Sequence, residues 1–296
     1  MIKYEWRDHL SPDESAELAD MLSRAAKYDA EPEYNTIDYA DVAGSLGQSD
    51  SRHLLIWMLP QSVALTGRHE GERIAGLLRL VFTSTQAAEA TVVIDPELRS
   101  IGIVTQLLEH LGVDATAPDG WAGTGAHTVT GWARGNHPAT GRISDRFLIP
   151  RTDRTWKLIR STRPAENGAA APVLERLESE ALADIGWQNR ISPGGQVLAL
   201  REAGSVVGLA SLDLAASHSP EFGVCGTIAC VAYARHADID PIRRLLAGAA
   251  AAAHDAGLEG VTIYVDSQDP GLVNACRLTG FQHDRTDARY QLGEHT

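Results

Sequence analysis

The sequence has no run of about 18 apolar residues, the length that a membrane-spanning helix requires. Its first residues also lack the apolar stretch of a secretory signal peptide. Only three residues are cysteine (Cys225, Cys230 and Cys276), too few and too unevenly spaced for a disulfide framework. These absences predict a protein of the reducing cytoplasm without membrane attachment.

Positive charge is also scarce, since 26 Lys and Arg face 39 Asp and Glu and give a formal net charge of −13. This balance argues against general binding to nucleic acid or to anionic membranes, because both need a cationic face toward phosphate. A local basic pocket for a small phosphorylated ligand remains compatible with this balance. The eleven histidines are scattered, without a Cys/His cluster, so we expect no metal site.

Two halves of similar pattern follow one another in the chain. Hydrophobic residues make up 44% of the 296, which is enough for two cores. Residues 74–77 (Ile-Ala-Gly-Leu) match residues 206–209 (Val-Val-Gly-Leu), and Trp132 and Pro138 match Tyr264 and Pro270 at the same spacing of 132 positions. Two matches at one spacing favour duplication, although any two α/β domains can share Gly-Leu strand fragments.

Hydrophobic spacing predicts the same succession of strands and helices in each half. A stretch at 161–172 with Pro, Gly, Asn and several Ala is typical of a linker. We therefore expect an N-terminal domain at 1–160 and a C-terminal domain at 173–296. The predicted elements include strands at 53–58, 74–82, 90–94, 128–133 and 154–159, helices at 103–111 and 138–147, then a helix at 174–182, strands at 197–200, 206–212, 226–231 and 261–265, helices at 241–256 and 271–278, and a last strand at 289–292.

Residues 91–104 form the most informative segment, because an apolar strand stops, a short turn follows and a helix begins near Gly102. A helix start offers unpaired N–H groups and a positive dipole end, which together bind phosphate. Gly102 lets the backbone approach a diphosphate, Arg99 adds a charge, and the open edge of 92–94 suits an extended ligand with amides. The predicted ligand contacts are Val92, Val93, Ile94, Arg99, Ser100, Ile101, Gly102, Ile103 and Val104. The alternative is a surface arginine beside a helix-starting glycine.

Arg99-x-x-Gly102 in this strand–turn–helix setting resembles the motif Arg/Gln-x-x-Gly-x-Gly/Ala of the Gcn5-related N-acetyltransferase (GNAT) superfamily. Val104 occupies the last motif position, where that superfamily has Gly or Ala. The resemblance implies acetyl-CoA as the acyl donor. It also implies an α/β (α+β) fold of two tandem GNAT-like domains, each with a mixed, mostly antiparallel central sheet flanked by helices.

Further segments resemble the mycothiol synthase family of tandem GNAT proteins: Trp6-Arg7, residues 53–55, residues 132–135, and residues 264–267 with Gly280-Phe281. The resemblance implies acetyl transfer from acetyl-CoA to the cysteinyl amine of a cysteine–glucosamine–inositol conjugate, the last step of mycothiol biosynthesis. It also implies a monomer whose partner is this small amine.

In that family the C-terminal half carries a Glu for the amine and a Tyr that protonates the sulfur of CoA. These positions align here with Cys225 and Cys276, whose alternative role is inert packing. Tyr264 aligns with a substrate-lining tyrosine but also suits a half-buried strand. Asp269 stands where many GNAT proteins have an Asn that touches the cofactor, and otherwise fits an ordinary turn before Pro270.

The second phosphate turn, at 236–241, contains no glycine and carries Asp238 and Asp240, which would repel a diphosphate. Asp240-Pro241 instead suits a plain helix start. Two further hypotheses therefore stay open. One is a catalytically degenerate tandem GNAT protein that binds acetyl-CoA or a partner without turnover. The other is an enzyme that acetylates another amine, such as an antibiotic or a protein N-terminus.

Overall fold

The computed structural model describes residues 2–59, 71–164, 170–191, 195–234 and 238–293. Residues 165–169 of the predicted linker and residues 236–237 of the second phosphate turn lie outside this part. The chain forms two compact units. Unit 1 comprises Met1–Asp153 together with Asp287–Thr296, and unit 2 comprises Arg154–Thr286.

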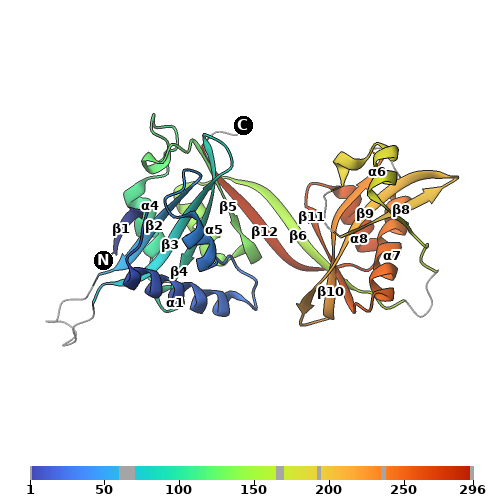
Figure 1. The fold of residues 1–296 in the computed structure, drawn as a ribbon, viewed down its shortest axis with the longest axis horizontal. Helices are drawn as coiled ribbons and strands as arrows, with labels where there is room; N and C mark the ends of the chain where they lie inside the picture. The colour runs from blue at the N-terminus through green and yellow to red at the C-terminus, as the bar shows by residue number, and fades with distance from the viewer. Residues whose placement is uncertain (1, 60–70, 165–169, 192–194, 235–237, 294–296) are drawn as a thin grey trace. The chain divides into compact units, whose positions relative to one another are not determined.

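Unit 1 is a mixed sheet with helices on both faces (Figure 1). Its strand order is β1-β2-β3-β4-β5-β12, in which β4 and β5 are parallel and the other neighbours antiparallel. The elements are β1 (Ile2–Arg7), α1 (Pro12–Asp29), α2 (Tyr39–Ser45), β2 (Ser51–Met58), β3 (Arg73–Phe82), β4 (Ala87–Ile94), α4 (Ile103–Leu111), β5 (Thr128–Ala133), α5 (Pro138–Phe147) and β12 (Gln282–Gly293).

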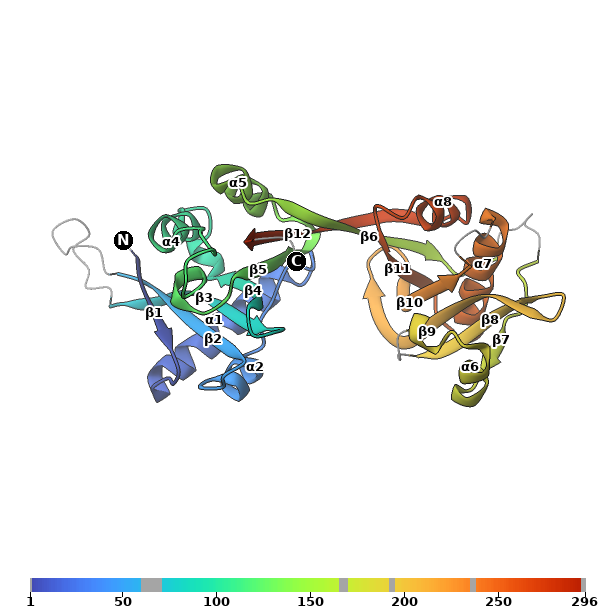
Figure 2. The ribbon, with the colours of Figure 1, turned by 90° about the horizontal axis from the view of Figure 1, so that it is seen from above.

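Helix α1 begins in a capping box, in which Ser11 and Glu14 each accept the other's backbone N–H. Leu18 and Met21 of this helix are buried against one face of the sheet, which α1 and α2 cover. Ile103 and Leu107 of α4 are buried on the opposite face. Figure 2 shows α4 and α5 on one side of the unit 1 strands and α1 and α2 on the other. The sheet is thus covered twice, and β4 lies between the two cores.

Unit 2 repeats the arrangement with the strand order β7-β8-β9-β10-β11-β6. Strands β10 and β11 are its parallel pair. Helices α7 and α8 cover the larger core, and α6 packs on a smaller one. The elements are β6 (Arg151–Ser161), β7 (Glu175–Leu177), α6 (Ser179–Ile185), β8 (Gln196–Glu202), β9 (Ser205–Ser219), β10 (Gly223–Tyr233), α7 (Ile239–Asp255), β11 (Gly260–Asp266) and α8 (Pro270–Leu278).

The last strand of each half of the sequence pairs with a strand of the other unit. Strand β6 follows α5 in the chain but pairs antiparallel with β11 of unit 2. Strand β12 follows α8, and its residues 288–293 pair with β5 of unit 1. The division of the chain therefore differs from the predicted 1–160 and 173–296, because strand pairing is non-local and leaves no mark on the local pattern.

The predicted mixed, mostly antiparallel sheets flanked by helices agree with the structure. The predicted helix at 174–182 is wrong in its first half, where β7 pairs with β8 before α6 begins. Within the described part of the chain, every helix is too short or too polar to cross a lipid bilayer.

Candidate functional site

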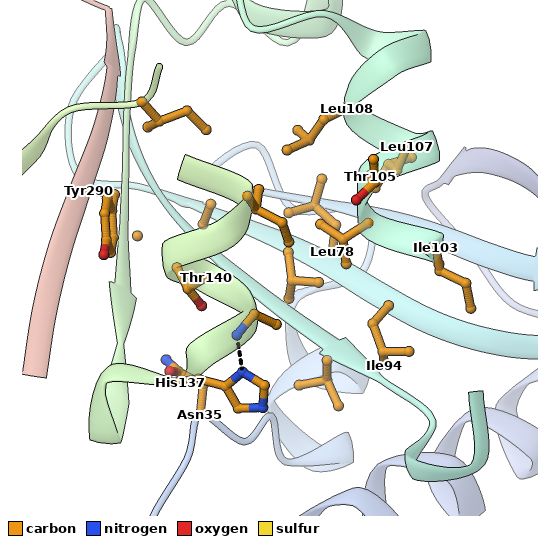
Figure 3. A pocket seen from close by; sticks show the side chains of 18 of the residues that line it. Asn35, Leu78, Ile94, Ile103, Thr105, Leu107, Leu108, His137, Thr140 and Tyr290 are labelled. Atoms are coloured by element: carbon orange, nitrogen blue, oxygen red, sulfur yellow. Dashed lines mark hydrogen bonds between the residues drawn. The ribbon is translucent and has the colours of Figure 1, made fainter. Parts of the chain in front are cut away.

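A cavity of about 650 Å³ lies within unit 1, between α4 and α5 and over the point where β4 and β5 separate (Figure 3). Its wall also includes residues of β12 and of the connection after α1. The inner part is apolar and deeply buried, with Leu107 only 1% exposed. Its inner lining includes Leu78, Leu107, Leu108, Trp121, Val129 and Leu292.

The cavity follows from the way β4 and β5 diverge. The parallel pairing covers only residues 87–89 of β4 and 128–130 of β5. Beyond it, residues 92–94 remain paired with β3 on their other side. Within the described residues, the edge of 92–94 that faces β5 therefore carries backbone N–H and C=O groups without a strand partner. Such an edge binds extended ligands that contain amides.

The turn after β4 places an uncapped helix start at the mouth of this cavity. Gly102 has φ +87° and makes no side-chain cap, and α4 begins at the next residue. Gly102, Ile103 and Val104 all line the cavity, and no heavy atom lies within 4 Å of the point where a Cβ on Gly102 would be. The first amides of a helix lack intrahelical acceptors and lie at its positive end. This turn therefore suits a phosphate group.

Two ion pairs connect this turn to α1. Arg99 donates two hydrogen bonds to Asp29, at 2.6 and 2.7 Å, and Arg24 donates two to Asp95, at 3.0 and 2.9 Å. The hydrogen bonds to Asp29 are the main cause that raises the pKa of Arg99 above its ordinary value. Arg99 was expected to offer its charge to the ligand, but in the structure its guanidinium pairs with the buried carboxylate of Asp29.

A second arginine at the cavity is better placed to meet an anion. Arg142 of α5 lines the cavity, is exposed, and has no carboxylate partner within the described chain. Arg146, one turn later, is instead paired with Glu109 of α4. Sequence analysis missed Arg142, since α5 carries no local motif that marks one of its arginines as unpaired.

His137 caps α5 at the edge of the cavity. Its Nδ1 accepts the N–H of Ala139 at 3.1 Å, and its ring meets the edge of Tyr34 with 4.4 Å between ring centroids. Burial, and next the charge of Arg99, lower the pKa of His137. The ring is thus neutral at pH 7, and because Nδ1 is an acceptor, the proton lies on Nε2. His137 therefore offers a hydrogen-bond donor rather than a base.

Tyr290 of β12 also lines the cavity (Figure 3). It stands directly opposite Gly131 of β5 in an antiparallel pair, so its ring projects to the same face as the missing side chain of Gly131. Its hydroxyl has no hydrogen-bond partner among the described residues. No local motif marks this position, and the strand at 289–292 was assigned to the other half.

Eight of the nine predicted ligand contacts line the cavity. Ile101 is the exception, with its side chain 54% exposed and directed outside the lining. Val104 lies on the cavity wall at the motif position where glycine or alanine was expected. The local motif thus located the cavity, while Arg142, His137 and Tyr290 come from segments that the sequence did not connect with it.

Comparison with known proteins finds similarity in structure alone. No protein-family model matches the sequence, and no curated protein matches it. A tandem GNAT protein from the clavulanic acid biosynthesis pathway superposes with a TM-score of 0.60 at 13% identity, covering 100% of both chains. The GCN5-related N-acetyltransferase of Sphaerobacter thermophilus gives 0.55 at 13% identity, covering 97% of this chain and 95% of its own.

A GNAT-family acetyltransferase of Colwellia psychrerythraea gives a TM-score of 0.53 at 11% identity, with 99% of each chain covered. This chain has a tandem GNAT fold. The predicted fold class is therefore confirmed. At these identities the likeness concerns the fold, so the activity has to be argued from the residues of the cavity.

Unit 2 buries the two cysteines that align with the Glu and Tyr positions of the resembled family. Cys225 and Cys276 are fully buried in the core of unit 2. Burial raises the pKa of Cys225, and burial followed by the charge of Asp269 raises the pKa of Cys276 to about 12. Both thiols are thus neutral packing groups at physiological pH. Tyr264, the predicted substrate contact, is 42% exposed on β11.

Asp269 caps α8 of unit 2. One of its oxygens accepts the N–H of Leu272 at 2.9 Å, and the other accepts the hydroxyl of Tyr233 at 2.8 Å. Burial and this hydrogen bond raise the pKa of Tyr233 to about 12. Both oxygens of Asp269 therefore accept hydrogen bonds within the protein. These bonds are those of a structural turn residue, the alternative to the predicted contact with a cofactor.

The start of α7 differs from the start of α4 in charge. Asp238 stands at its N-cap and Asp240 in its first turn, where unit 1 has Gly102 and Val104. Two carboxylates at a helix start stabilise the helix but oppose a bound phosphate. Among the described residues, no group of three or more His, Cys, Asp or Glu could hold a metal ion.

Proposed function

We propose that this protein transfers an acyl group from acyl-CoA to an amine, and that unit 1 holds the acyl-CoA. One observation carries the proposal: an unpaired strand edge and an uncapped helix start open into the same cavity. CoA carries both matching groups, a chain with two amides and a diphosphate. In unit 2, Asp238 and Asp240 occupy the start of the corresponding helix α7, where their charges would oppose a diphosphate.

The residues of the cavity suit the parts of acyl-CoA in order. The amides at 102–104 would receive the diphosphate, with Arg142 as the nearby positive charge. Residues 92–94 would pair with the amides of the pantetheine arm. The arm would then lead the thioester toward the apolar inner part beside Val129, where water is excluded.

Acyl transfer needs a neutral amine, a polarised thioester carbonyl and a proton for the departing thiolate. A backbone N–H of 92–94 that the pantetheine arm leaves unpaired would stabilise the negative charge that develops on the carbonyl oxygen. The amine nitrogen forms a bond to the carbonyl carbon, and the carbon–sulfur bond breaks. Tyr290 then gives its phenolic proton to the sulfur and regains a proton from the newly formed ammonium.

Acetyl-CoA and the cysteine–glucosamine–inositol conjugate are the donor and acceptor that we propose first. The sequence resemblance to the mycothiol synthase family supports this pair, which would make the protein a cytoplasmic enzyme of mycothiol biosynthesis. A second candidate is binding of acetyl-CoA without turnover. It is favoured by the burial of Cys225 and Cys276 at the two positions where that family carries its acid and base.

Calorimetry and product analysis on the full-length protein test these alternatives together. Acetyl-CoA is titrated into the protein, and the conjugate is then incubated with both and analysed by mass spectrometry, because its own thiol would obscure an assay for released CoA. An N-acetylated product supports the enzyme. Tight binding without product, from the conjugate or from a panel of other amines, supports the second candidate. Absence of binding contradicts both.

A further inference from the structure

Two reciprocal ion pairs join α1 to the turn that precedes α4. Helix α1 contributes Arg24 and Asp29, and the turn contributes Asp95 and Arg99, so each segment gives one cation and one anion. Both carboxylates are at most 2% exposed, and each accepts two hydrogen bonds from its arginine. Paired arginine–carboxylate bonds fix both distance and orientation.

Three groups of unit 1 hold the side chain of Arg99. Besides Asp29, its Nε donates to the carbonyl of Ile94 at 3.1 Å, and its guanidinium lies 5.1 Å from the ring centroid of Tyr28. A diphosphate that drew this side chain away from these contacts would leave the carboxylate of Asp29 buried without a partner. That exchange is unfavourable, because an unpaired buried charge is strongly destabilising.

Asp29 also fixes the facing wall of the cavity. Its carbonyl accepts the N–H of Tyr34 at 3.1 Å, and the ring of Tyr34 packs against His137. The same ring fills the space beside Gly135, where a Cβ would meet it at 2.9 Å. Asp29 therefore touches the phosphate turn through its side chain and the opposite wall through its backbone.

We infer that Asp29 and Arg99 form a positioning pair: Arg99 holds the phosphate turn in place and does not itself contact the diphosphate. The inference rests on the proposed function for the identity of the ligand. It reverses the sequence-based expectation for Arg99 and leaves the backbone amides and Arg142 as the direct contacts.

The Asp29→Asn variant separates the two possible roles of Arg99 by the direction in which the affinity for acetyl-CoA changes. If Arg99 touched phosphate, removal of its competing carboxylate would leave the affinity for acetyl-CoA unchanged or raise it. If the pair positions the turn, the same change displaces the amides and raises the Kd by about tenfold or more. Calorimetric titration of the full-length variant with acetyl-CoA measures the difference.

Arg99→Lys is the second variant, because it keeps the positive charge and loses the paired geometry. The positioning role predicts a weaker affinity for Arg99→Lys, whereas a direct charge contact predicts an affinity close to wild type. Arg73→Gln is the matched control, since Arg73 forms an exposed pair with Glu97 on the same turn. Its Kd should stay within about twofold of wild type. Unchanged binding in both Asp29→Asn and Arg99→Lys would overturn the inference.

Hydrogen exchange without ligand tests the pair independently of the proposed function. The amide of Leu98 donates to the carbonyl of Asp95 within the turn, and the amide of Gln106, in α4, donates to the carbonyl of Gly102 at the end of the turn. Asp29→Asn should speed their exchange relative to wild type, because the turn loses its attachment to α1. Unchanged exchange in Asp29→Asn would contradict the inference, whether or not the wild-type protein binds acetyl-CoA. Absence of acetyl-CoA binding to the wild-type protein would instead refute the proposed function.

Discussion

A carboxylate introduced at residue 102 should separate ligand binding from protein stability. Gly102 has φ +87°, and the space around its missing Cβ is open to 4 Å. Gly102→Asp therefore meets no clash, and its cost to folding is the left-handed backbone conformation, about 1 kcal/mol. Aspartate tolerates this conformation better than most residues. We expect thermal unfolding of the variant to stay close to that of wild type.

The effect on acyl-CoA binding should be much larger. Two like charges about 4 Å apart near a protein surface repel by about 4 kcal/mol, and salt reduces this repulsion. If half of it remains, about 2 kcal/mol is lost, which raises the Kd for acetyl-CoA by about 30-fold. Calorimetry at two ionic strengths measures this loss, which should be smaller at the higher one.

Two variants complete the Gly102→Asp experiment. Gly102→Asn has the same shape and strain without the charge, so the difference between the two variants isolates electrostatic repulsion. Asp240→Gly changes the start of α7 in unit 2 and should leave the Kd unchanged. Electrostatic repulsion is refuted if Gly102→Asp and Gly102→Asn bind acetyl-CoA with equal affinity. The assignment of the site to unit 1 is refuted if Asp240→Gly changes the Kd as much as Gly102→Asp does.

Three further predictions concern single side chains. Arg142→Gln should raise the Kd for acetyl-CoA by about tenfold and make it less sensitive to salt, and an unchanged salt dependence would show that Arg142 does not meet the ligand. Tyr290→Phe should lower kcat by about 100-fold while the Kd for acetyl-CoA stays near wild type, and an unchanged kcat would exclude Tyr290 as the acid. Burial lowers the pKa of His53 to about 4, against about 6.5 in the unfolded chain. The free energy of unfolding should therefore fall by up to about 3 kcal/mol as the pH drops from 6.5 to 4, and His53→Gln should lack this part of the decline in denaturant titrations at each pH.

The geometry of the turn at 95–102 could be predicted because its signal is local. A strand that ends, a glycine and a helix that begins occupy adjacent positions, and φ +87° at Gly102 is a conformation that glycine adopts without strain. The role of Arg99 could not be predicted in the same way. Its partner Asp29 lies at the end of α1, and only the packing of that helix on the sheet brings the two together.

Tyr290 and β7 show where local pattern fails. The strand around Tyr290 was predicted, but its partner β5 was not, since alternating apolar residues specify a face and leave the neighbouring strand open. At 175–177 the apolar spacing suits a helix, yet pairing with β8 makes these residues a strand. In both places, pairing between segments that are distant in the sequence overrides the local pattern.

Crystals of the full-length protein soaked with acetyl-CoA test whether unit 1 holds the acyl-CoA. We expect electron density for the diphosphate on the amides of residues 102–104, with the pantetheine arm beside residues 92–94 and Arg99 still bound to Asp29. Density at the start of α7 in unit 2, or a cavity in unit 1 that stays empty at saturating acetyl-CoA, would contradict it.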